Sequence, residues 1–515
     1  MSESLNPIEL AVFVARCAAV CDEMGLILRS AAFSPNIKDR LDYSCALFDA
    51  DGRMFAQAAH VPVHLGSMAF AMQQVVGLRQ WRAGDELIWN DPFLGGTHLP
   101  DVTLVRPFFS GSQLLGFVAN RAHHAQIGAA TPGSMPLSKH LDEEGLVIPP
   151  TLLFEGGKVN GALRASLQAA LGAGTAADLA AQSSANRVGI NRLEQMITAL
   201  SAQRFADAID QLNGYGRAVA EAGVRRIPEG RYGFEDVMDS DGHAAANCTI
   251  KVEITVADAA VHVDFTGTSS AVPGNINCPL SVAAAGVFYV IRCLLPPETP
   301  ACAGAFEVVT IQAAPGCLVH AQRPAATAAG NVETSMRIVD CMLGALATAL
   351  PQDIPAASQG TMNNVAMGRV GHWDYYETLG GGTGASSQQA GIDAVQSHMT
   401  NTLNTPIEVL ESNYPIQVLE YSVRAGSGGA GKQDGGQGLV RSYRFLAETE
   451  VTLITERRVS APWGLAGGDP GLPGMNYLDG QCLPDKVQLW VLPSQVLRIE
   501  TPGGGGWGEK DQGST

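Results

Sequence analysis

The stretch of sequence that decides the fold reads Asn90-Asp-Pro-Phe-Leu-Gly-Gly-Thr-His-Leu-Pro-Asp101 and continues through two apolar segments, residues 102–109 and 114–122, to the pair His123-His124. Pro100 rules out a helix here, so His98 and Asp101 are predicted to flank a turn that enters a strand. The residues between the apolar segments, Ser110-Gly-Ser-Gln113, are typical of a hairpin turn. We therefore predict a β-hairpin with polar residues at its open end.

A hairpin centred on Ser112 places Asp101 opposite His123. Cross-strand neighbours bring Cβ atoms within about 5 Å, which is close enough to share a metal ion. The register is open by one residue, and a slip would exchange His123 for His124. His98, Asp101 and one of these two histidines would supply two nitrogens and one oxygen, a set that suits a catalytic Zn, Mn or Fe ion. Histidines with satisfied hydrogen bonds and capping aspartates are the alternative explanation.

Other polar residues surround this set in the sequence. Six of the 11 histidines lie between residues 60 and 140, and His60 and His64 either line the same cavity or are structural. Asp42 follows Arg40 closely, which indicates either an ordinary ion pair or a catalytic carboxylate. The polar loops 360–364, 375–378 and 397–401 would either contact a small polar ligand or only bond among themselves.

The composition excludes several classes of protein. With 33 basic and 50 acidic residues the formal net charge is −17, which argues against a nucleic-acid partner, because such proteins need a basic footprint. The chain is 46% hydrophobic and 16% charged, below the roughly 25% charged residues of an average protein, so we expect a large interface. No basic signal region begins the chain and no stretch approaches the roughly 18 apolar residues of a membrane span. We expect a cytoplasmic protein without membrane association.

The predicted fold class is α+β. An N-terminal α/β region with the candidate metal site covers residues 1–177, a helical spacer covers 178–230, and a strand-rich α+β region covers 231–515. Asn6, Pro7 and Glu9 predict a capped helix to about Arg29, and residues 43–48 predict a strand. The C-terminal region has predicted strands at 248–256, 260–265, 307–313, 416–424, 439–446 and 451–455 and helices at 282–295 and 333–350.

One glycine-rich motif resembles a phosphate-binding loop. Gly426-Ser-Gly-Gly-Ala-Gly-Lys432 matches the pattern until Gln433, which stands where Ser or Thr would bind magnesium. A strand, not a helix, is predicted next, so the helix N-terminus on which phosphate binding depends is missing. We interpret the loop as a hairpin turn and predict no nucleotide-binding residues in this chain.

The sequence resembles the B subunits of ATP-dependent hydantoinases and oxoprolinases. The segments that carry the resemblance are 34–45, 60–68, 90–101, 121–124, 264–268, 330–335, 359–364, 398–402, 462–464 and 501–508. Related subunits of acetone and acetophenone carboxylases are similar. The resemblance implies a heteromer in which an A-type subunit binds Mg-ATP and phosphorylates the substrate oxygen, while the B-type subunit completes the reaction beside a divalent metal.

The resemblance also implies roles for individual residues. The family's metal ligands fall on His98, Asp101 and His123, and Asp42 becomes a catalytic candidate together with Asp101. From the sequence and the resemblance together, the candidates for positions behind the ligands or in the cavity are His124, His60, His64, Asp91 and Gln126. Gln126 is a departure, because these sequences usually carry Asp there, and a neutral amide can orient a histidine but cannot act as a base.

The function implied is ATP-dependent hydrolysis of a small cyclic amide, such as a hydantoin, oxoproline or another lactam. Phosphorylation of the amide oxygen makes a good leaving group, after which a metal-activated water can attack. One alternative is a subunit of an ATP-dependent ketone carboxylase, and a second is a non-catalytic, metal-stabilised scaffold subunit. We prefer hydrolysis because acetone carboxylase counterparts are longer chains and because the resemblance to the amidohydrolase B subunits is intact.

Overall fold

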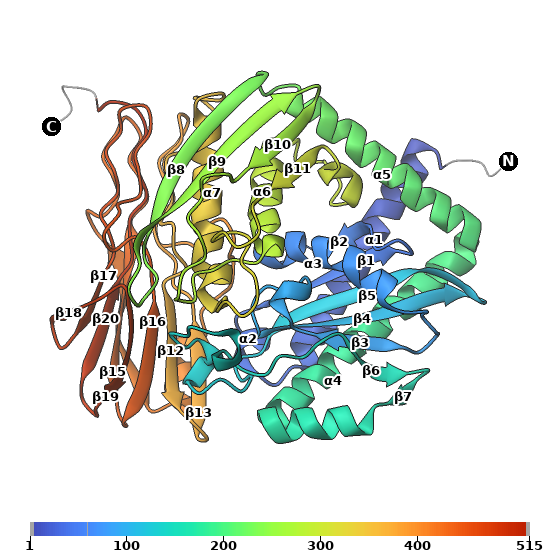
Figure 1. The fold of residues 1–515 in the computed structure, drawn as a ribbon, viewed down its shortest axis with the longest axis horizontal. Helices are drawn as coiled ribbons and strands as arrows, with labels where there is room; N and C mark the ends of the chain where they lie inside the picture. Colours follow the sequence, from blue (N-terminus) through green and yellow to red (C-terminus); the bar gives the residue numbers. More distant parts are fainter. Residues whose placement is uncertain (1–4, 59, 511–515) are drawn as a thin grey trace.

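The computed structural model describes residues 5–58 and 60–510 and has the predicted α+β class (Figure 1). Its described strands form four sheets. In Figure 1 the N-terminal sheet lies at the right and the C-terminal sheets at the left, with helices α6 (Leu280–Leu294) and α7 (Ser335–Ala347) between them. No helix in the described ranges is long and apolar enough to cross a membrane.

The N-terminal sheet carries the predicted hairpin at its centre. Its strand order is β2-β1-β5-β4-β3-β6-β7, and each neighbouring pair is antiparallel. The strands are β1 (Tyr43–Asp49), β2 (Met54–Gln57), β3 (Glu86–Trp89), β4 (Asp101–Ser110), β5 (Gln113–His123), β6 (Thr151–Glu155) and β7 (Lys158–Val159). The central position of β4 and β5 buries the open end of the hairpin.

The register of this hairpin is the predicted one at the open end, where Asp101 pairs with His123. At the tip Ser110 pairs with Gln113, so the turn is one residue tighter than a hairpin centred on Ser112. A β-bulge between Phe108 and Phe109 compensates for this difference.

Three long helices pack beside this sheet. Helix α1 (Pro7–Ala31) begins with the predicted capping box of Asn6 and Glu9. Helix α4 (Gly161–Leu200) begins earlier than the predicted residue 178 and is broken at Gly172, where φ is 84°. Helix α5 (Ala202–Val224) follows. The proposed division at residues 177 and 230 remains a prediction, although α4 runs across residue 177.

The middle of the chain forms a smaller sheet with the order β11-β10-β9-β8. Its strands are β8 (Gly230–Ser240), β9 (Ala246–Ala257), β10 (Ala260–Asp264) and β11 (Val309–Gln312). Helix α7 packs against β8 and β9, and α6 packs against α3 (Pro62–Val75), a helix that the sequence did not predict. The gap between α3 and α6 is narrow, because a Cβ at Gly66 would lie 2.5 Å from the Ala285 Cα.

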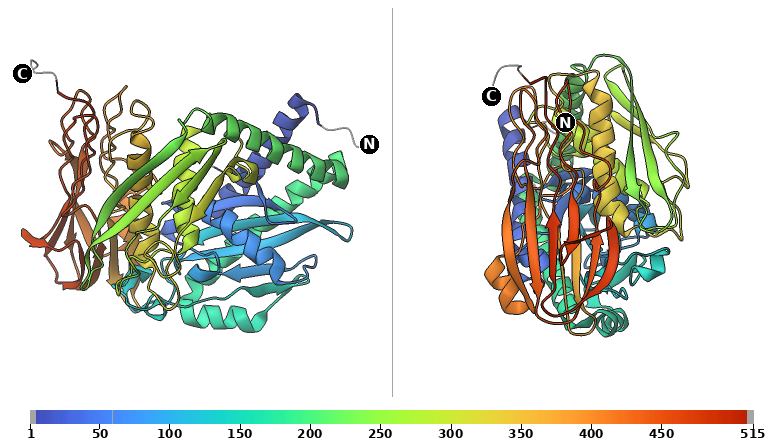
Figure 2. Two further views of the ribbon diagram at one scale, coloured as in Figure 1. Left: turned by 45° about the horizontal axis from the view of Figure 1, so that its top comes forward. Right: turned by 90° about the vertical axis from the view of Figure 1, so that its left-hand side faces the viewer.

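The C-terminal region contains two sheets that share one apolar core, and Figure 2 shows them from a second side. One has the order β13-β12-β16-β19 and the other β14-β15-β20-β17-β18. Their strands are β12 (Asn364–Arg369), β13 (Trp373–Glu377), β14 (Ile416–Arg424), β15 (Gly438–Phe445), β16 (Thr449–Ile454), β17 (Met475–Leu478), β18 (Gln481–Leu483), β19 (Lys486–Val491) and β20 (Val496–Glu500). Short helices α2 (Pro35–Lys38) and α8 (Ile407–Asn413) complete the fold.

The predicted elements of this C-terminal region are confirmed with small shifts of their ends. The six predicted strands correspond to β9, β10, β11, β14, β15 and β16, and the two helices to α6 and α7. The sequence did not predict β8 in the middle sheet, nor β12, β13 or β17–β20. The glycine-rich loop 426–432 lies in the connection from β14 to β15, which pair as antiparallel neighbours, and is followed by a strand as expected.

Glycine-rich segments from three parts of this region lie against one another with no room for side chains. The Gly504 N–H donates to the Gly436 carbonyl oxygen at 2.8 Å, and the Gly436 N–H donates to the Thr383 carbonyl oxygen at 2.9 Å. A Cβ at Gly504 would lie 1.9 Å from the same Thr383 oxygen. Glycine is therefore required here for close approach of one backbone to another.

Replacing Gly504 with alanine is expected to lower the free energy of unfolding by about 1–3 kcal/mol, because the methyl group must displace a hydrogen-bonded backbone. Chemical denaturation followed by circular dichroism measures the change. Gly214→Ala in α5 is the matched control, since a Cβ there meets no atom within 4 Å, and it should stabilise the chain by about 0.5–1 kcal/mol. Equal stability of the two variants would refute this view of the packing.

Candidate metal centre

His98, Asp101 and His123 come together at the open end of the hairpin, and all three are buried. They offer one ligand atom each, and these atoms lie within 4.8 Å of one another. His98 Nε2 lies 3.2 Å and His123 Nδ1 lies 3.3 Å from Oδ1 of Asp101. The hairpin strand ends thus hold the two-nitrogen, one-oxygen set.

Hydrogen bonds hold the outer atoms of this set, whereas atoms that point into the cluster have none. Asp101 Oδ2 accepts from Thr97 Oγ1 at 2.5 Å and from Asn331 Nδ2 at 3.3 Å, whereas Oδ1 has no hydrogen bond within the described chain. His98 Nδ1 lies 3.3 Å from the Ala328 carbonyl oxygen, and its Nε2 also has no hydrogen bond there. A histidine held through one ring nitrogen with the other left free is the usual arrangement of a metal ligand. The residues therefore fit a divalent metal ion.

Strand geometry decides which of the two adjacent histidines, His123 or His124, faces Asp101. The His123 N–H donates to the Asp42 carbonyl oxygen at 3.0 Å, and the His124 N–H donates to the Pro100 carbonyl oxygen at 2.8 Å. The side chain of His124 lies 2.9 Å from Gln182 Oε1 on α4, measured from its Nε2. His123, not His124, is therefore the residue that faces Asp101.

Asp42 and His64 border the same cluster. His64 Nε2 lies 3.2 Å from Asp101 Oδ2 and 4.0 Å from Asp42 Oδ1. The other carboxylate oxygen of Asp42 lies 4.0 Å from His123 Nδ1. Asp42 is thus a second carboxylate in the site, and His64 lies between it and Asp101.

Arg40 does not neutralise Asp42, so the ordinary ion pair considered from the sequence is wrong. Its NH1 donates to the Tyr376 carbonyl oxygen at 2.9 Å, and its NH2 donates to Thr378 Oγ1 at 3.2 Å and to Thr402 Oγ1 at 3.3 Å. Arg40 instead fastens the C-terminal loops to the N-terminal region beside the cluster.

The walls of the site come from both ends of the chain. The Tyr376 ring stacks on His123, with ring centroids 5.0 Å apart and an interplanar angle of 12°. Residues from all three predicted polar loops line a cavity of about 20 Å³, and they include Met362, Tyr376, Thr378, Met399 and Thr400. That volume is enough for about one water molecule.

Four of the five predicted surrounding residues lie outside the cavity at the cluster, and His64 alone lines it. His60 Nδ1 accepts from the Cys45 N–H at 3.2 Å. Asp91 pairs with Arg323 and accepts from the Phe93 N–H. Gln126 Oε1 accepts from the Gly128 N–H at 3.2 Å, and Gln126 and His124 line a different cavity.

The electrostatics favour an ionised Asp101. Burial by itself raises the pKa of this carboxyl, but the imidazoles of His98, His64 and His123 outweigh that effect and hold its pKa well below the usual range. Burial likewise lowers the pKa of His123, whereas the Asp101 charge overcomes burial and raises the pKa of His98. A cation is bound by an ionised carboxylate and neutral imidazoles, so a metal ion would displace the proton that the Asp101 charge favours on His98.

Two residues of the site were not identified from the sequence as site residues. Asn331 lies on a π-helical turn, Gly330–Thr334, that precedes α7, and such turns are frequent at functional sites. Its Oδ1 has no hydrogen bond within the described chain. Thr97 was overlooked because only its position in the folded loop brings its hydroxyl to Asp101.

The fold and the buried cluster define an α+β protein with a candidate divalent-metal centre. Comparison with known proteins is more specific: residues 6–510 match the family model described as hydantoinase B/oxoprolinase, and the chain belongs to that family. It is 37% identical to 5-oxoprolinase 1 of Arabidopsis thaliana over 97% of its own length, and it spans 42% of that longer relative.

Two solved structures share the fold. The ATP-dependent caprolactamase from Pseudomonas jessenii superimposes with a TM-score of 0.92 and 25% identity, covering 98% of this chain and 92% of that one. Acetone carboxylase in its nucleotide-free form gives a TM-score of 0.88 at 16% identity, and the match covers 98% of this chain and 76% of that one. The second likeness concerns the fold alone.

Proposed function

We propose that this chain is the B-type subunit of a heteromeric, cytoplasmic, ATP-dependent cyclic amidase. It would hold one divalent metal ion at His98, Asp101 and His123. The observation that carries this proposal is the pair of facing atoms, His98 Nε2 and Asp101 Oδ1, that are buried without a hydrogen bond within the described chain. Zn, Mn and Fe all suit such a mixed set of ligands.

When bound, the metal would supply a Lewis acid that polarises the substrate oxygen or activates a water. Asp101 keeps its Oδ1 directed to the cluster because Thr97 and Asn331 bind its other oxygen. Tyr376 fixes the plane of His123 by stacking. The protein part of the mechanism is therefore to hold the ligands rigid in a site that admits little water.

Asp42 is the residue that we propose as the general base. Its side-chain oxygens lie 4.0 Å from His64 and from His123 and accept no hydrogen bond from another described residue. A carboxylate in this position can take a proton from water that attacks the activated carbonyl carbon. The attacked carbon becomes tetrahedral, and the ring opens when the C–N bond breaks and the nitrogen takes up a proton, which leaves an acyl phosphate. A second water would hydrolyse this acyl phosphate to a carboxylate and inorganic phosphate.

The phosphorylation step is assigned to an A-type partner subunit. The chain spans 42% of the Arabidopsis 5-oxoprolinase, so much of that protein has no counterpart here, and the glycine-rich loop 426–432 is not followed by a helix. An amide carbonyl is a poor electrophile, and phosphorylation of its oxygen makes hydrolysis feasible.

The isolated chain is expected to give no calorimetric signal with Mg-ATP, because its glycine-rich loop lacks both the hydroxyl residue and the helix N-terminus of a phosphate site. Binding should appear only when an A-type subunit is added. Micromolar binding by the chain alone that disappears in Lys432→Ala would contradict this assignment.

Reconstitution of both subunits tests the reaction itself. The mixture is supplied with Mg-ATP and a panel of lactams and ketones, and ADP, ring opening and labelled bicarbonate are followed. We expect a lactam to open with ADP formed. Label fixed into a ketone without any lactam opened would instead establish the ketone carboxylase, for which the shared fold of acetone carboxylase is the supporting observation.

His64→Ala is expected to weaken metal binding about 10–100-fold, the usual cost of losing a residue that supports a ligand. The reason is the 3.2 Å contact of His64 Nε2 with Asp101 Oδ2. Competition with a chelator measures the change. His60→Ala serves as the matched control, and equal affinities in the two variants would show that His64 has no part in the site.

A further inference from the structure

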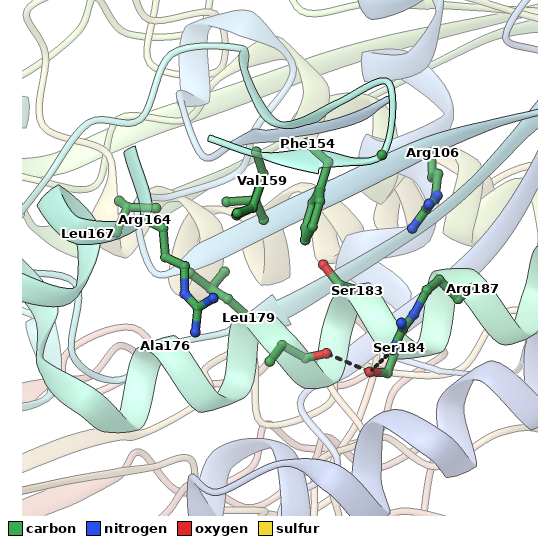
Figure 3. Close-up of a pocket in the computed structure, with 13 residues that line it drawn as sticks. Arg106, Phe154, Val159, Arg164, Leu167, Ala176, Leu179, Ser183, Ser184 and Arg187 are labelled. Carbon is green, nitrogen blue, oxygen red and sulfur yellow. Dashed lines mark hydrogen bonds between the residues drawn. The ribbon is translucent and has the colours of Figure 1, made fainter. Parts of the chain in front are cut away.

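Another cavity lies between the β6–β7 hairpin and helix α4 (Figure 3). It shares no lining residue with the cavity at the metal cluster. Its volume is about 270 Å³. The break at Gly172 divides α4 into two parts that line different sides, with Arg164 and Leu167 before the break and Leu179 and Arg187 after it. Both parts of the broken helix therefore contribute residues to the cavity.

The floor and walls of this cavity are largely apolar. Its apolar side chains are Leu153, Phe154, Val159, Leu167 and Leu179. Figure 3 shows Phe154 and Val159 on the hairpin side and Leu179 on the helix side. Such walls favour an aliphatic or aromatic body in the ligand, since burial of apolar surface is the main source of affinity in small-molecule sites.

Three guanidinium groups surround the apolar walls. Arg106 and Arg187 lie at one end of the cavity and Arg164 at the other (Figure 3). None of the three has a carboxylate within ion-pair distance in the described chain, and Arg187 donates to Ser184 Oγ at 3.0 Å. This concentration of positive charge is unusual in a protein with a net charge of −17.

A buried carboxyl supplies a counter-charge to two of these arginines. Glu86 is buried, accepts from Ser183 Oγ at 2.7 Å and from Asn186 Nδ2 at 3.0 Å, and interacts electrostatically with Arg106 and Arg187. One buried carboxyl leaves an excess of positive charge at that end. A ligand carboxylate can form charge-assisted hydrogen bonds with these two guanidinium groups.

We propose that this cavity binds a small amphipathic carboxylate, with the carboxylate between Arg106 and Arg187 and the apolar tail along Phe154, Val159 and Leu179. The proposal does not depend on the metal site or on the reaction of the chain. Charge complementarity selects the head group, and the apolar walls select a tail several carbons long.

Calorimetric titration of the full chain with octanoate tests the proposal. We expect saturable binding at millimolar concentration or below, with affinity rising up to about fourfold for each methylene from butanoate to octanoate, as burial of CH₂ groups requires. Octanol should bind at least about tenfold more weakly, because it lacks the charge. Absence of saturable octanoate binding, or equal binding of octanol, would overturn the assignment.

The matched variants separate a specific site from general charge attraction. The double variant Arg106→Gln, Arg187→Gln should lose at least about tenfold in octanoate affinity. The control, Arg16→Gln with Arg226→Gln, makes the same change in net charge at exposed positions away from the cavity and should bind normally. Thermal unfolding verifies that each variant is folded. Equal loss in both double variants would also refute the site.

Discussion

Asp101→Asn should lose metal and turnover together. Its metal affinity should fall by more than about 100-fold, since even the loss of a residue that supports a ligand lowers the affinity by about 10–100-fold. The substitution preserves shape but removes the negative charge that faces His98 and His123. Elemental analysis after dialysis gives the metal content, and ADP-coupled ring opening with the partner subunit gives the activity.

Asp91→Asn is the control for this experiment. Asp91 is also buried and precedes the same hairpin, but it pairs with Arg323 outside the cluster. It should retain both metal and activity. If Asp101→Asn lost metal yet kept full turnover within an intact complex, the chain would be a scaffold and our assignment of the chemistry would fail.

Asp42→Asn should separate metal binding from catalysis. We expect its metal content to stay near that of the native chain, because the facing ligand atoms of His98, Asp101 and His123 remain in place. Turnover should fall by about 10²–10⁴-fold, which is the usual contribution of a general base. The two measurements are the metal content and the single-turnover rate of ring opening.

The contrary result for Asp42 is equally informative. If its asparagine variant lost metal as completely as Asp101→Asn, the carboxylate would be a fourth ligand and not a base. If neither metal nor rate changed, the general base would have to be sought elsewhere. Asp374→Asn provides a matched control, since this carboxyl lines the separate cavity that contains Gln126.

The hairpin and its register could be predicted because the information is local. Pro100, two apolar segments and a polar turn fix the strands, and pairing across the turn then brings Asp101 to His123. The same reasoning left His123 and His124 open, since a one-residue slip reverses the faces of a strand. The observed register of β4 and β5 resolves the choice, and the contact of His124 with Gln182, a residue far along the chain, agrees with it.

The remainder of the site depends on contacts between distant segments. His64 lies on α3, a helix without a clear capping residue, so its sequence did not indicate how the side chain would point. Asn331 and Tyr376 reach the cluster only after the C-terminal region has folded over the N-terminal sheet. Such approaches follow from packing and leave no local pattern in the sequence.

The C-terminal sheets show a further limit of sequence reasoning. Strands β17 to β20 are short and interspersed with glycine and proline, so their alternation is weak. The glycines near Gly504 suggest loops when read locally, whereas in the structure they permit backbone-to-backbone contact between segments far apart in sequence. Composition indicated turns but could not indicate which segments would meet.

The β-bulge between Phe108 and Phe109 gives the hairpin a tolerance to length changes at its tip. The extra residue lies between the turn and the paired ends, so the tip can differ by one residue without altering which residues meet at Asp101 and His123. A one-residue insertion or deletion at residues 110–113 can therefore leave the pairing of Asp101 with His123 unchanged. The length of the exposed tip and the geometry of the ligand set are therefore separate features of the same hairpin.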